Sequence, residues 1–335
     1  MTATVLFASG QLGDIKDGQI QNMLDQYGYG NLISFRKTSQ GAMEQTLHIE
    51  SSRGSFILKG NPLYPGQLAE EKFFIDQIAK RTNIPVPTPY IIDETKNIFE
   101  WSYSIMPCLP GSHLDSARIQ ESICGKDSIQ LAELLAETLT ILHSWKSEVF
   151  GEWDTTEGHV KPFSESYPDW LFSRVKHWLK DAEKYSVIKL EDYRWVEEML
   201  ESSRAVFTTF ESPTFVMGDF KPGNFLVARD TRWKISGVFD FTNAYFADPL
   251  SDLAKMAIHY WDHQKGDEAA HFIQLYTRNN AIKENERIRL HIHLLHQRVL
   301  DWGCAHAIGA VTWEKQLSFS DWMKRYIDKT ERLFV

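Results

Sequence analysis

Three polar residues in the second half of the sequence have types and a spacing that suit phosphoryl transfer. Asp219 stands five positions before Asn224, and Asp240 follows one further strand and turn later. Phosphoryl transfer needs the acceptor hydroxyl aimed in line and cations that hold the phosphates, with little covalent chemistry from the protein. A carboxylate at 219 can accept the hydroxyl proton, while oxygen donors at 224 and 240 suit Mg²⁺. The pattern therefore indicates Mg²⁺-dependent transfer of a phosphoryl group to a hydroxyl.

Each of these signals is weak when taken alone. Asp-x-x-x-x-Asn arises by chance in many chains, and Lys-Pro-Gly-Asn at 221–224 is a common turn sequence. Their joint occurrence in order is more specific, because apolar strands flank them and a strand lysine, a helix glutamate and a chain break precede them. The whole set therefore favours a site over a set of unrelated turns.

The elements that would position these residues fall into two parts, and the first is rich in strands. Alternating apolar residues and turn chemistry predict helices at 18–27 and 67–80, and strands at 32–37, 46–50, 55–59, 90–93 and 99–106. The prolines at 84–89 exclude helix there. A second break at 107–111 ends this part.

The second part is mainly helical. Apolar periodicity predicts helices at 131–142, 170–184, 192–210, 250–263 and 287–307, with one β-rich interruption at 215–240. The sequence thus predicts an α+β fold with two lobes. They are a small β-rich N-lobe at 1–106 and a large, mainly helical C-lobe at 112–335, joined by a hinge at 107–111.

Composition excludes several other classes of function. The chain has 335 residues and a formal net charge of -9, and it shows no basic patch, so a nucleic-acid partner is not expected. No apolar run reaches the roughly 20 residues that span a bilayer. Three cysteines without a CxxC pair suit reduced thiols, and the N-terminus lacks the features of a signal peptide. These observations predict a cytoplasmic protein without a membrane partner, and they leave its oligomeric state open.

At the same positions the sequence resembles the aminoglycoside phosphotransferase and choline kinase-like family of the protein kinase-like superfamily. The segment Gly218-Asp219 to Asn224 carries the family's H-G-D-x-x-x-x-N loop without its His. Asp240-Phe241 carries D-F, and the segment at 248–254 carries D-P-x-x-D-L-A. The resemblance runs from roughly residue 32 to residue 260. It implies a bilobal protein kinase-like fold, ATP or alternatively GTP with Mg²⁺ as cofactors, and a small-molecule hydroxyl as acceptor.

The resemblance also implies roles for individual residues. Asp219 would be the catalytic Asp, and Asn224 and Asp240 would be the Mg²⁺ ligands. Asp252 would brace the catalytic loop without entering the chemistry. Lys221 stands where many relatives have His and gives Asp-x-Lys-Pro-x-Asn, as in eukaryotic protein kinases, where that Lys approaches the transferred phosphoryl group. We therefore expect Lys221 to act beside Asp219.

In the N-lobe, a lysine and a glutamate are expected to hold the nucleotide phosphates. Lys59 ends an apolar strand, as a phosphate-contacting lysine should. Glu71 precedes apolar pairs in the pattern of the family's helix and would form an ion pair with Lys59. Glu70 is the competing choice, because helix boundaries read from sequence are uncertain.

Two backbone segments complete the expected nucleotide site. The chain has no GxGxxG between the first strands, so only residues 38–42, with Ser39 and Gly41, can form the turn that covers the phosphates. The segment 105–111 resembles the family's hinge. There the backbone around Met106 to Cys108 would meet the nucleotide base, with one N–H fewer because residue 107 is proline.

Two departures from the family keep other readings open. Met217 stands where the family has His, from which we expect altered support of the loop rather than lost activity. Lys221 keeps a protein kinase possible, but Asp248 follows Asp240 so closely that little room remains for an activation loop. A catalytically inert pseudokinase that binds nucleotide is the alternative from another class, and the complete set of charged residues argues against it.

The expected acceptor is cationic. Acidic residues lie beside aromatic ones at Asp169-Trp170, in the segment 259–262 and at Asp301-Trp302. Carboxylates would bind a polycationic sugar, and aromatic faces would bind a quaternary amine. The sequence therefore favours an aminoglycoside-type acceptor, with choline, amino alcohols, sugars and nucleosides as alternatives.

Overall fold

The computed structural model describes residues 12–38, 46–283, 286–331 and 333. The chain divides into two compact units. The first, called the N-terminal unit, contains Met1–Ser116, Thr155–Glu157 and Gly223–Thr242; the second, called the helical unit, contains Ala117–Asp154, Gly158–Pro222 and Asn243–Val335. Ser39 and Gly41, predicted to cover the phosphates, lie outside the described residues.

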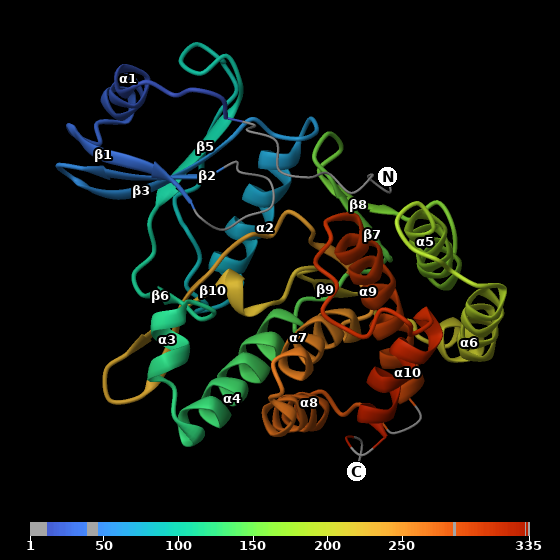
Figure 1. Cartoon of the computed structure of the whole chain (residues 1–335). Helices are drawn as coiled ribbons and strands as arrows, with labels where there is room; N and C mark the ends of the chain where they lie inside the picture. Colours follow the sequence, from blue (N-terminus) through green and yellow to red (C-terminus); the bar gives the residue numbers. More distant parts are fainter. Residues whose placement is uncertain (1–11, 39–45, 284–285, 332, 334–335) are drawn as a thin grey trace. The chain divides into compact units, whose positions relative to one another are not determined.

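An antiparallel five-stranded sheet forms the N-terminal unit, in the order β1-β2-β3-β5-β4 (Figure 1). Its strands are β1 (Leu32–Lys37), β2 (Thr46–Ser51), β3 (Gly54–Gly60), β4 (Ile91–Asp93) and β5 (Tyr103–Pro107). The strands predicted at 32–37, 46–50, 55–59 and 90–93 are thereby confirmed. Alternating burial in β2 and β3 shows why the sequence pattern identified them.

The strand predicted at 99–106 is wrong in its first half. Lys96 and Glu100 have φ angles of 60° and 63°, which lie in the left-handed region, so the chain turns there instead of extending. Phe99 is nevertheless buried and stacks on Trp101 at a ring distance of 4.7 Å. The aromatic alternation therefore reflects packing of a turn into the core rather than a strand.

Two helices, α1 (Asp17–Tyr27) and α2 (Gln67–Arg81), cover opposite faces of this sheet (Figure 1). Met23 and Leu24 of α1 share one buried core with Leu58 of β3. Successive strand residues alternate between faces, so Lys59 points the other way, and there it contacts Glu71 of α2. The apolar pattern of β3 thus fixes where its terminal lysine points.

A second sheet of the N-terminal unit has the order β11-β10-β6. It consists of β6 (Ser112–His113), β10 (Phe225–Arg229) and β11 (Trp233–Val238), with the 3₁₀ turn η1 (Pro222–Asn224) before β10. The hairpin β10–β11 is part of the interruption predicted at 215–240, and β9 (Thr214–Val216) of the helical unit is its first strand. The hinge predicted at 107–111 stays a prediction.

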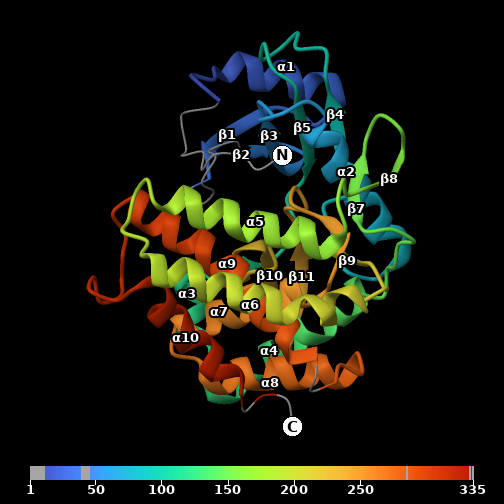
Figure 2. The same ribbon diagram turned by 90° about the vertical axis from the view of Figure 1, so that its right-hand side faces the viewer.

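Packed helices form most of the helical unit, where α5, α6 and α7 all contact α9 (Figure 2). Five of its helices confirm predicted ones: α4 (Gly125–Leu142), α5 (Tyr167–Ala182), α6 (Leu190–Thr208), α7 (Leu250–Asp262) and α9 (Arg287–Ala307). The α+β class, with a β-rich first part and a helical second part, is confirmed. None of the described helices is both long and apolar enough to cross a membrane.

Several elements of this unit were not predicted. They are α3 (Ala117–Ser122), α8 (Gly266–Asn279), α10 (Phe319–Thr330) and the strands β7 (Gly151–Asp154), β8 (His159–Pro162) and β12 (Tyr245–Ala247), which join β9 in the order β8-β7-β12-β9. The start of α10 could have been predicted from the sequence, because Ser318 is a typical N-cap residue and its side chain accepts a hydrogen bond from the Asp321 N–H. The strands are too short to show a period.

Candidate active site

The nucleotide-binding pair predicted in the N-terminal unit forms as an ion pair. Lys59 Nζ lies 2.9 Å from Glu71 Oε2 and 3.3 Å from Asp240 Oδ1. The Tyr90 hydroxyl donates to the same Glu71 oxygen at 2.8 Å. Glu70, the competing choice, instead accepts from the Tyr64 hydroxyl at 3.0 Å. Glu71 is therefore the partner of Lys59.

Lys59 remains a cation in this buried position. Burial alone would lower the pKa of its ammonium group, but the charges of Glu71 and Asp240 outweigh burial and raise the pKa above its usual value. The lysine therefore carries its charge at every physiological pH. A fixed positive charge is what the binding of nucleotide phosphates requires.

Asn224 and Asp240 lie at the same end of the hairpin β10–β11. Phe225, directly after Asn224, is the register partner of Val238, and the Phe239 N–H donates to the Asn224 carbonyl at 3.3 Å. Asp240 follows as the next residue, with φ at 68°. The hairpin thus brings together two oxygen donors that the sequence separates.

This donor set fits Mg²⁺. A carboxylate and a side-chain amide are hard oxygen ligands, which Mg²⁺ prefers. Asp240 Oδ1 accepts from Lys59 Nζ and from Thr242 Oγ1 at 2.9 Å, and its side chain is 36% exposed. Asn224 is buried. The roles of both residues as metal ligands stay predictions.

In the helical unit, Asp219 lies between two lysines. Lys221 Nζ is 2.7 Å from one carboxylate oxygen, and Lys255 Nζ is 3.0 Å from the other. Burial alone would raise the pKa of the Asp219 carboxyl, but the charges of Lys255 and Lys221 outweigh it and lower the pKa to about 2. Asp219 is therefore ionised and can accept a proton or a hydrogen bond from a hydroxyl.

The loop that carries Asp219 is held by Asp252 of α7. The backbone N–H groups of Met217 and Gly218 donate to the two oxygens of Asp252 at 2.7 and 2.8 Å. His143 Nε2 lies 3.2 Å from Asp252, and His143 Nδ1 lies 2.6 Å from the Tyr276 hydroxyl. The bracing contact expected for Asp252 is thus present, and His143 and Tyr276 extend it.

Sequence reasoning missed three of these residues. Tyr276 lies on α8, which was not predicted, and His143 follows the end of α4 without any motif. Lys255 stands three positions after Asp252 on α7, in the segment that carries the family motif. Helical spacing places positions three apart on one face, so this signal could have been read.

The expected hinge backbone is already engaged at one point. The Cys108 N–H donates to the Ser55 carbonyl at 2.9 Å, which continues the pairing of β5 with β3. Met106 pairs with Ile57 in the same ladder. A base contact by Cys108 would therefore use its carbonyl, and the part of both residues in base binding stays a prediction.

Comparison with known proteins identifies the family. A model described as the phosphotransferase enzyme family matches residues 34–287, which is most of the chain. The chain belongs to this family. It is therefore a phosphotransferase that acts on an alcohol group, and the predicted family is confirmed. No curated protein sequence matches it at a significant level.

Solved structures similar to this phosphotransferase show the same fold. The GDP complex of aminoglycoside 2'-phosphotransferase-IIIa has a TM-score of 0.64 and 13% identity, covering 95% of this chain and 98% of that one. A thermostable mutant of aminoglycoside phosphotransferase APH(4)-Ia, in complex with ADP and hygromycin B, has a TM-score of 0.61 and 16% identity, covering 92% and 97%. At such identities the likeness establishes the kinase-like fold alone.

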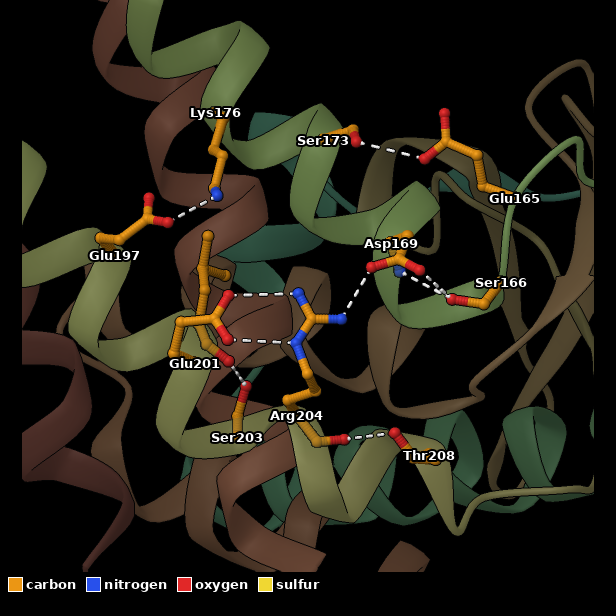
Figure 3. A network of polar contacts seen from close by, with 11 residues as sticks. Glu165, Ser166, Asp169, Ser173, Lys176, Glu197, Glu201, Ser203, Arg204 and Thr208 are labelled. Carbon is orange, nitrogen blue, oxygen red and sulfur yellow. Dashed lines mark hydrogen bonds and ion pairs between the residues drawn. The ribbon is translucent and has the colours of Figure 1, made fainter.

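The carboxylates expected to bind a cationic acceptor are engaged elsewhere in this phosphotransferase. Figure 3 shows the Asp169 carboxylate held by Ser166 and by Arg204, whose Nη1 lies 2.7 Å away. Arg298 pairs with both Asp262, at 2.9 Å, and Asp301, at 3.0 Å. These acidic residues form ion pairs within or between helices, so the carboxylates no longer argue for a cationic acceptor.

Gly218 provides a test of how tightly the loop is held. Its φ is 77°, and a Cβ atom there would lie 2.1 Å from the Asn243 carbonyl oxygen. We expect Gly218→Ala to lower the free energy of unfolding by about 1–3 kcal/mol and to reduce kcat, because the loop must move. Urea denaturation and steady-state kinetics measure the two effects.

The matched control for this test is Gly158→Ala. Gly158 has a similar φ of 71°, but a Cβ there would meet no atom within 4 Å. It therefore reports the backbone strain without the clash. Equal stability losses in the two variants would contradict a tightly packed loop.

Proposed function

We propose that this chain transfers the γ-phosphoryl group of a Mg²⁺-bound nucleoside triphosphate to a hydroxyl group of a small molecule. The observation that carries the proposal is the intact charged set. Lys59 is paired with Glu71 and Asp240 in one unit, and Asp219 lies ionised on a braced loop in the other. A protein that only binds nucleotide would not need Asp219, so this set favours catalysis over the pseudokinase alternative.

Each residue has a defined part in the proposed reaction. Lys59, held by Glu71, contacts the nucleotide phosphates. Asn224 and Asp240 hold Mg²⁺, which when bound neutralises charge on the phosphates. Asp219 accepts the proton of the acceptor hydroxyl, and Lys221 approaches the transferred group.

ATP is the proposed phosphoryl donor, with GTP as the alternative. Similar structures are complexes with ADP, GDP or AMP-PNP. The hinge at 107–111, with Met106 and Cys108, would contact the base. The relative kcat/KM for ATP and GTP distinguishes the two donors.

An aminoglycoside-type, cationic acceptor is one candidate, because the similar structures are aminoglycoside phosphotransferases, one of them with hygromycin B bound. The paired carboxylates Asp169, Asp262 and Asp301 do not support this choice. Choline, amino alcohols, sugars and nucleosides remain candidates for the proposed reaction. A protein kinase activity is not favoured, because the chain matches a family of small-molecule enzymes.

The experiment that tests the proposed function is Mg²⁺-dependent consumption of ATP across a panel of acceptors. The panel contains aminoglycosides, choline, amino alcohols, sugars, nucleosides and hydroxy acids. We expect stoichiometric formation of ADP and a phosphorylated acceptor with at least one class. Binding of Mg²⁺-ATP without transfer to any acceptor would favour the pseudokinase instead.

The lowered pKa of Asp219 predicts the acid side of the pH profile. The carboxylate stays ionised as the pH falls to about 5, so kcat/KM should show no acid limb from this group between about pH 5 and 8. Lys255→Met removes one of the two charges that lower the pKa of Asp219. The acid limb of the kcat/KM profile of this variant should therefore move to higher pH. The lowered pKa would be contradicted if the kcat/KM profile of the wild type showed an acid limb between about pH 5 and 8 and the profile of Asp219→Asn did not.

A further inference from the structure

Two lysines contact the proposed catalytic carboxylate in the helical unit. Lys221 and Lys255 share Asp219 as their ion-pair partner. Asp301 and Asp252 also act on Lys255 electrostatically. Asp301 already accepts from Gln297 and Arg298, and Asp252 accepts from the backbone of the loop. Two ammonium groups therefore share one carboxylate.

Arg174 of α5 adds a third cation to this part of the helical unit. Its guanidinium carbon lies 4.6 Å from the centroid of the Trp170 ring, so the indole face fixes the orientation of the group. Its Nε atom is buried and has no hydrogen-bond partner, and among the described residues no carboxylate forms an ion pair with it. A buried charged donor without a partner is costly, which points to a ligand that satisfies it.

A series of contacts through α5, β12 and α7 connects Arg174 with Lys255. The Trp170 ring lies 5.6 Å from the Tyr245 ring, and the Tyr245 hydroxyl donates to Ser251 Oγ at 3.3 Å. Ser251 and Lys255 are four positions apart on α7 and share one face. This chain of contacts leads from α5 to the face of α7 that holds Asp219.

His296 of α9 is within electrostatic range of Arg174 and Lys255. Burial lowers the pKa of its imidazole, and the positive charges of Arg174 and Lys255 contribute to a value of about 3. His296 is therefore neutral, and its buried Nε2 has no hydrogen-bond partner among the described residues. In the described part of the chain, Arg174 Nε and His296 Nε2 are thus two buried polar atoms without a hydrogen-bond partner.

We propose that the acceptor carries an anionic group, a carboxylate or a phosphate, in addition to the hydroxyl that is phosphorylated. The Arg174 guanidinium binds this oxyanion with its planar fork, and His296 donates a hydrogen bond to it. Lys255 provides further attraction while it holds Asp219. A cationic group at the same place would be repelled by the Arg174 guanidinium.

The proposal rests on the proposed function and keeps its chemistry. A lone pair of the acceptor oxygen forms the bond to the γ-phosphorus, and the hydroxyl proton passes to Asp219. The bond between the γ-phosphorus and the bridging oxygen breaks, and its electron pair stays on the nucleoside diphosphate. The products are the diphosphate and a phosphate monoester that still carries the original anionic group.

The test separates acceptors by charge before their identity is known. Deproteinised small molecules from a cell extract are divided by ion exchange into anionic, neutral and cationic fractions. Each fraction is incubated with the full-length protein, Mg²⁺ and ATP labelled in the γ-phosphate, with Asp219→Asn as the blank. We expect at least about tenfold more transfer to the anionic fraction than to the cationic one. Mass spectrometry of the labelled product distinguishes a carboxylate from a phosphate.

Variants of Arg174 test the residue itself. Arg174→Met should lower kcat/KM for the anionic fraction by about tenfold to a hundredfold and leave Mg²⁺-ATP affinity unchanged. Arg174→Lys keeps the positive charge but loses the planar guanidinium group, so its kcat/KM should lie between those of the wild type and Arg174→Met. This variant also tests the proposal if Arg174→Met fails to fold. Lys176→Met is the matched control on the same helix, because Lys176 forms an exposed pair with Glu197 at 2.7 Å.

The outcomes are distinguishable. The proposal of an anionic acceptor would be wrong if phosphoryl transfer occurred only to the cationic or neutral fraction. It would also be wrong if no fraction were phosphorylated while Mg²⁺-ATP still bound. Neither result would contradict membership of the phosphotransferase family. Equal losses in Arg174→Met and Lys176→Met would overturn the role of Arg174. Absence of Mg²⁺-ATP binding in the wild type contradicts the proposed function, and the acceptor proposal falls with it.

Discussion

Asp219→Asn is expected to lower kcat by about a thousandfold to ten-thousandfold while Mg²⁺-ATP binding persists. In the proposed reaction the carboxylate accepts the hydroxyl proton and aims the acceptor, and general-base catalysis alone supplies effects of about 10²–10⁴. The amide keeps the size of the side chain but cannot accept the proton. Single-turnover kinetics with the best acceptor of the panel measures the loss of the chemical step.

The main complication is stability, because Asp219 is only 7% exposed and neutralises two lysines. Its loss leaves both ammonium groups without their partner, which is destabilising. The double variant Asp219→Asn with Lys255→Met relieves part of that cost and should remain equally inactive. Asp230→Asn, which removes a carboxylate that forms an exposed pair with Lys234, is the control. Turnover of Asp219→Asn within about tenfold of the wild type would exclude Asp219 as the catalytic carboxylate.

Loss of the proposed metal ligands should have the second large effect. Asp240→Ala is expected to weaken Mg²⁺-ATP binding by about a hundredfold or more, and Asn224→Ala by about tenfold. Residues that only orient metal ligands already change affinity by about tenfold to a hundredfold, and Asp240 contributes a full charge. Calorimetric titration with a non-hydrolysable ATP analogue, with and without Mg²⁺, measures both effects.

Thr242→Val separates the metal ligand from its surroundings. Thr242 Oγ1 donates to Asp240 Oδ1 at 2.9 Å, so this variant disturbs the orientation of the carboxylate and keeps its charge. We expect an affinity between those of the wild type and Asp240→Ala. Wild-type nucleotide affinity that does not depend on Mg²⁺ would contradict the assignment of both ligands.

The sequence by itself determined those features that depend on short-range patterns. The alternation of buried and less buried residues in β3 predicted that Lys59 ends a strand. The spacing of Asp219 and Asn224 predicted the loop between two strands. Both are local, because strand and helix periods are set by neighbouring residues. The family followed from these motifs, which the match over residues 34–287 confirms.

The choice between Glu70 and Glu71 as the partner of Lys59 could not be predicted from local sequence patterns. Both residues lie in the first turn and a half of α2, and the sequence offers the same charge at each. The phase of the helix against the sheet turns Glu71 inward to Lys59 and Tyr90, and it turns Glu70 outward to Tyr64. Packing of α2 on the sheet therefore decides which glutamate pairs with Lys59, and the residues around positions 70 and 71 do not predict it.

Tertiary structure alone decided which of the charged residues considered for acceptor binding are already paired. The sequence placed acidic residues beside tryptophans and so indicated a cationic acceptor, yet Arg204 and Arg298 reach the carboxylates of Asp169, Asp262 and Asp301 from other elements or other turns. Meanwhile Lys255 of α7 pairs with Asp219, whereas Arg174 of α5 forms no ion pair with a carboxylate among the described residues. Charge acts over the distance between atoms rather than along the chain. Composition can therefore count charges, but only the packed helices show which of them are already neutralised.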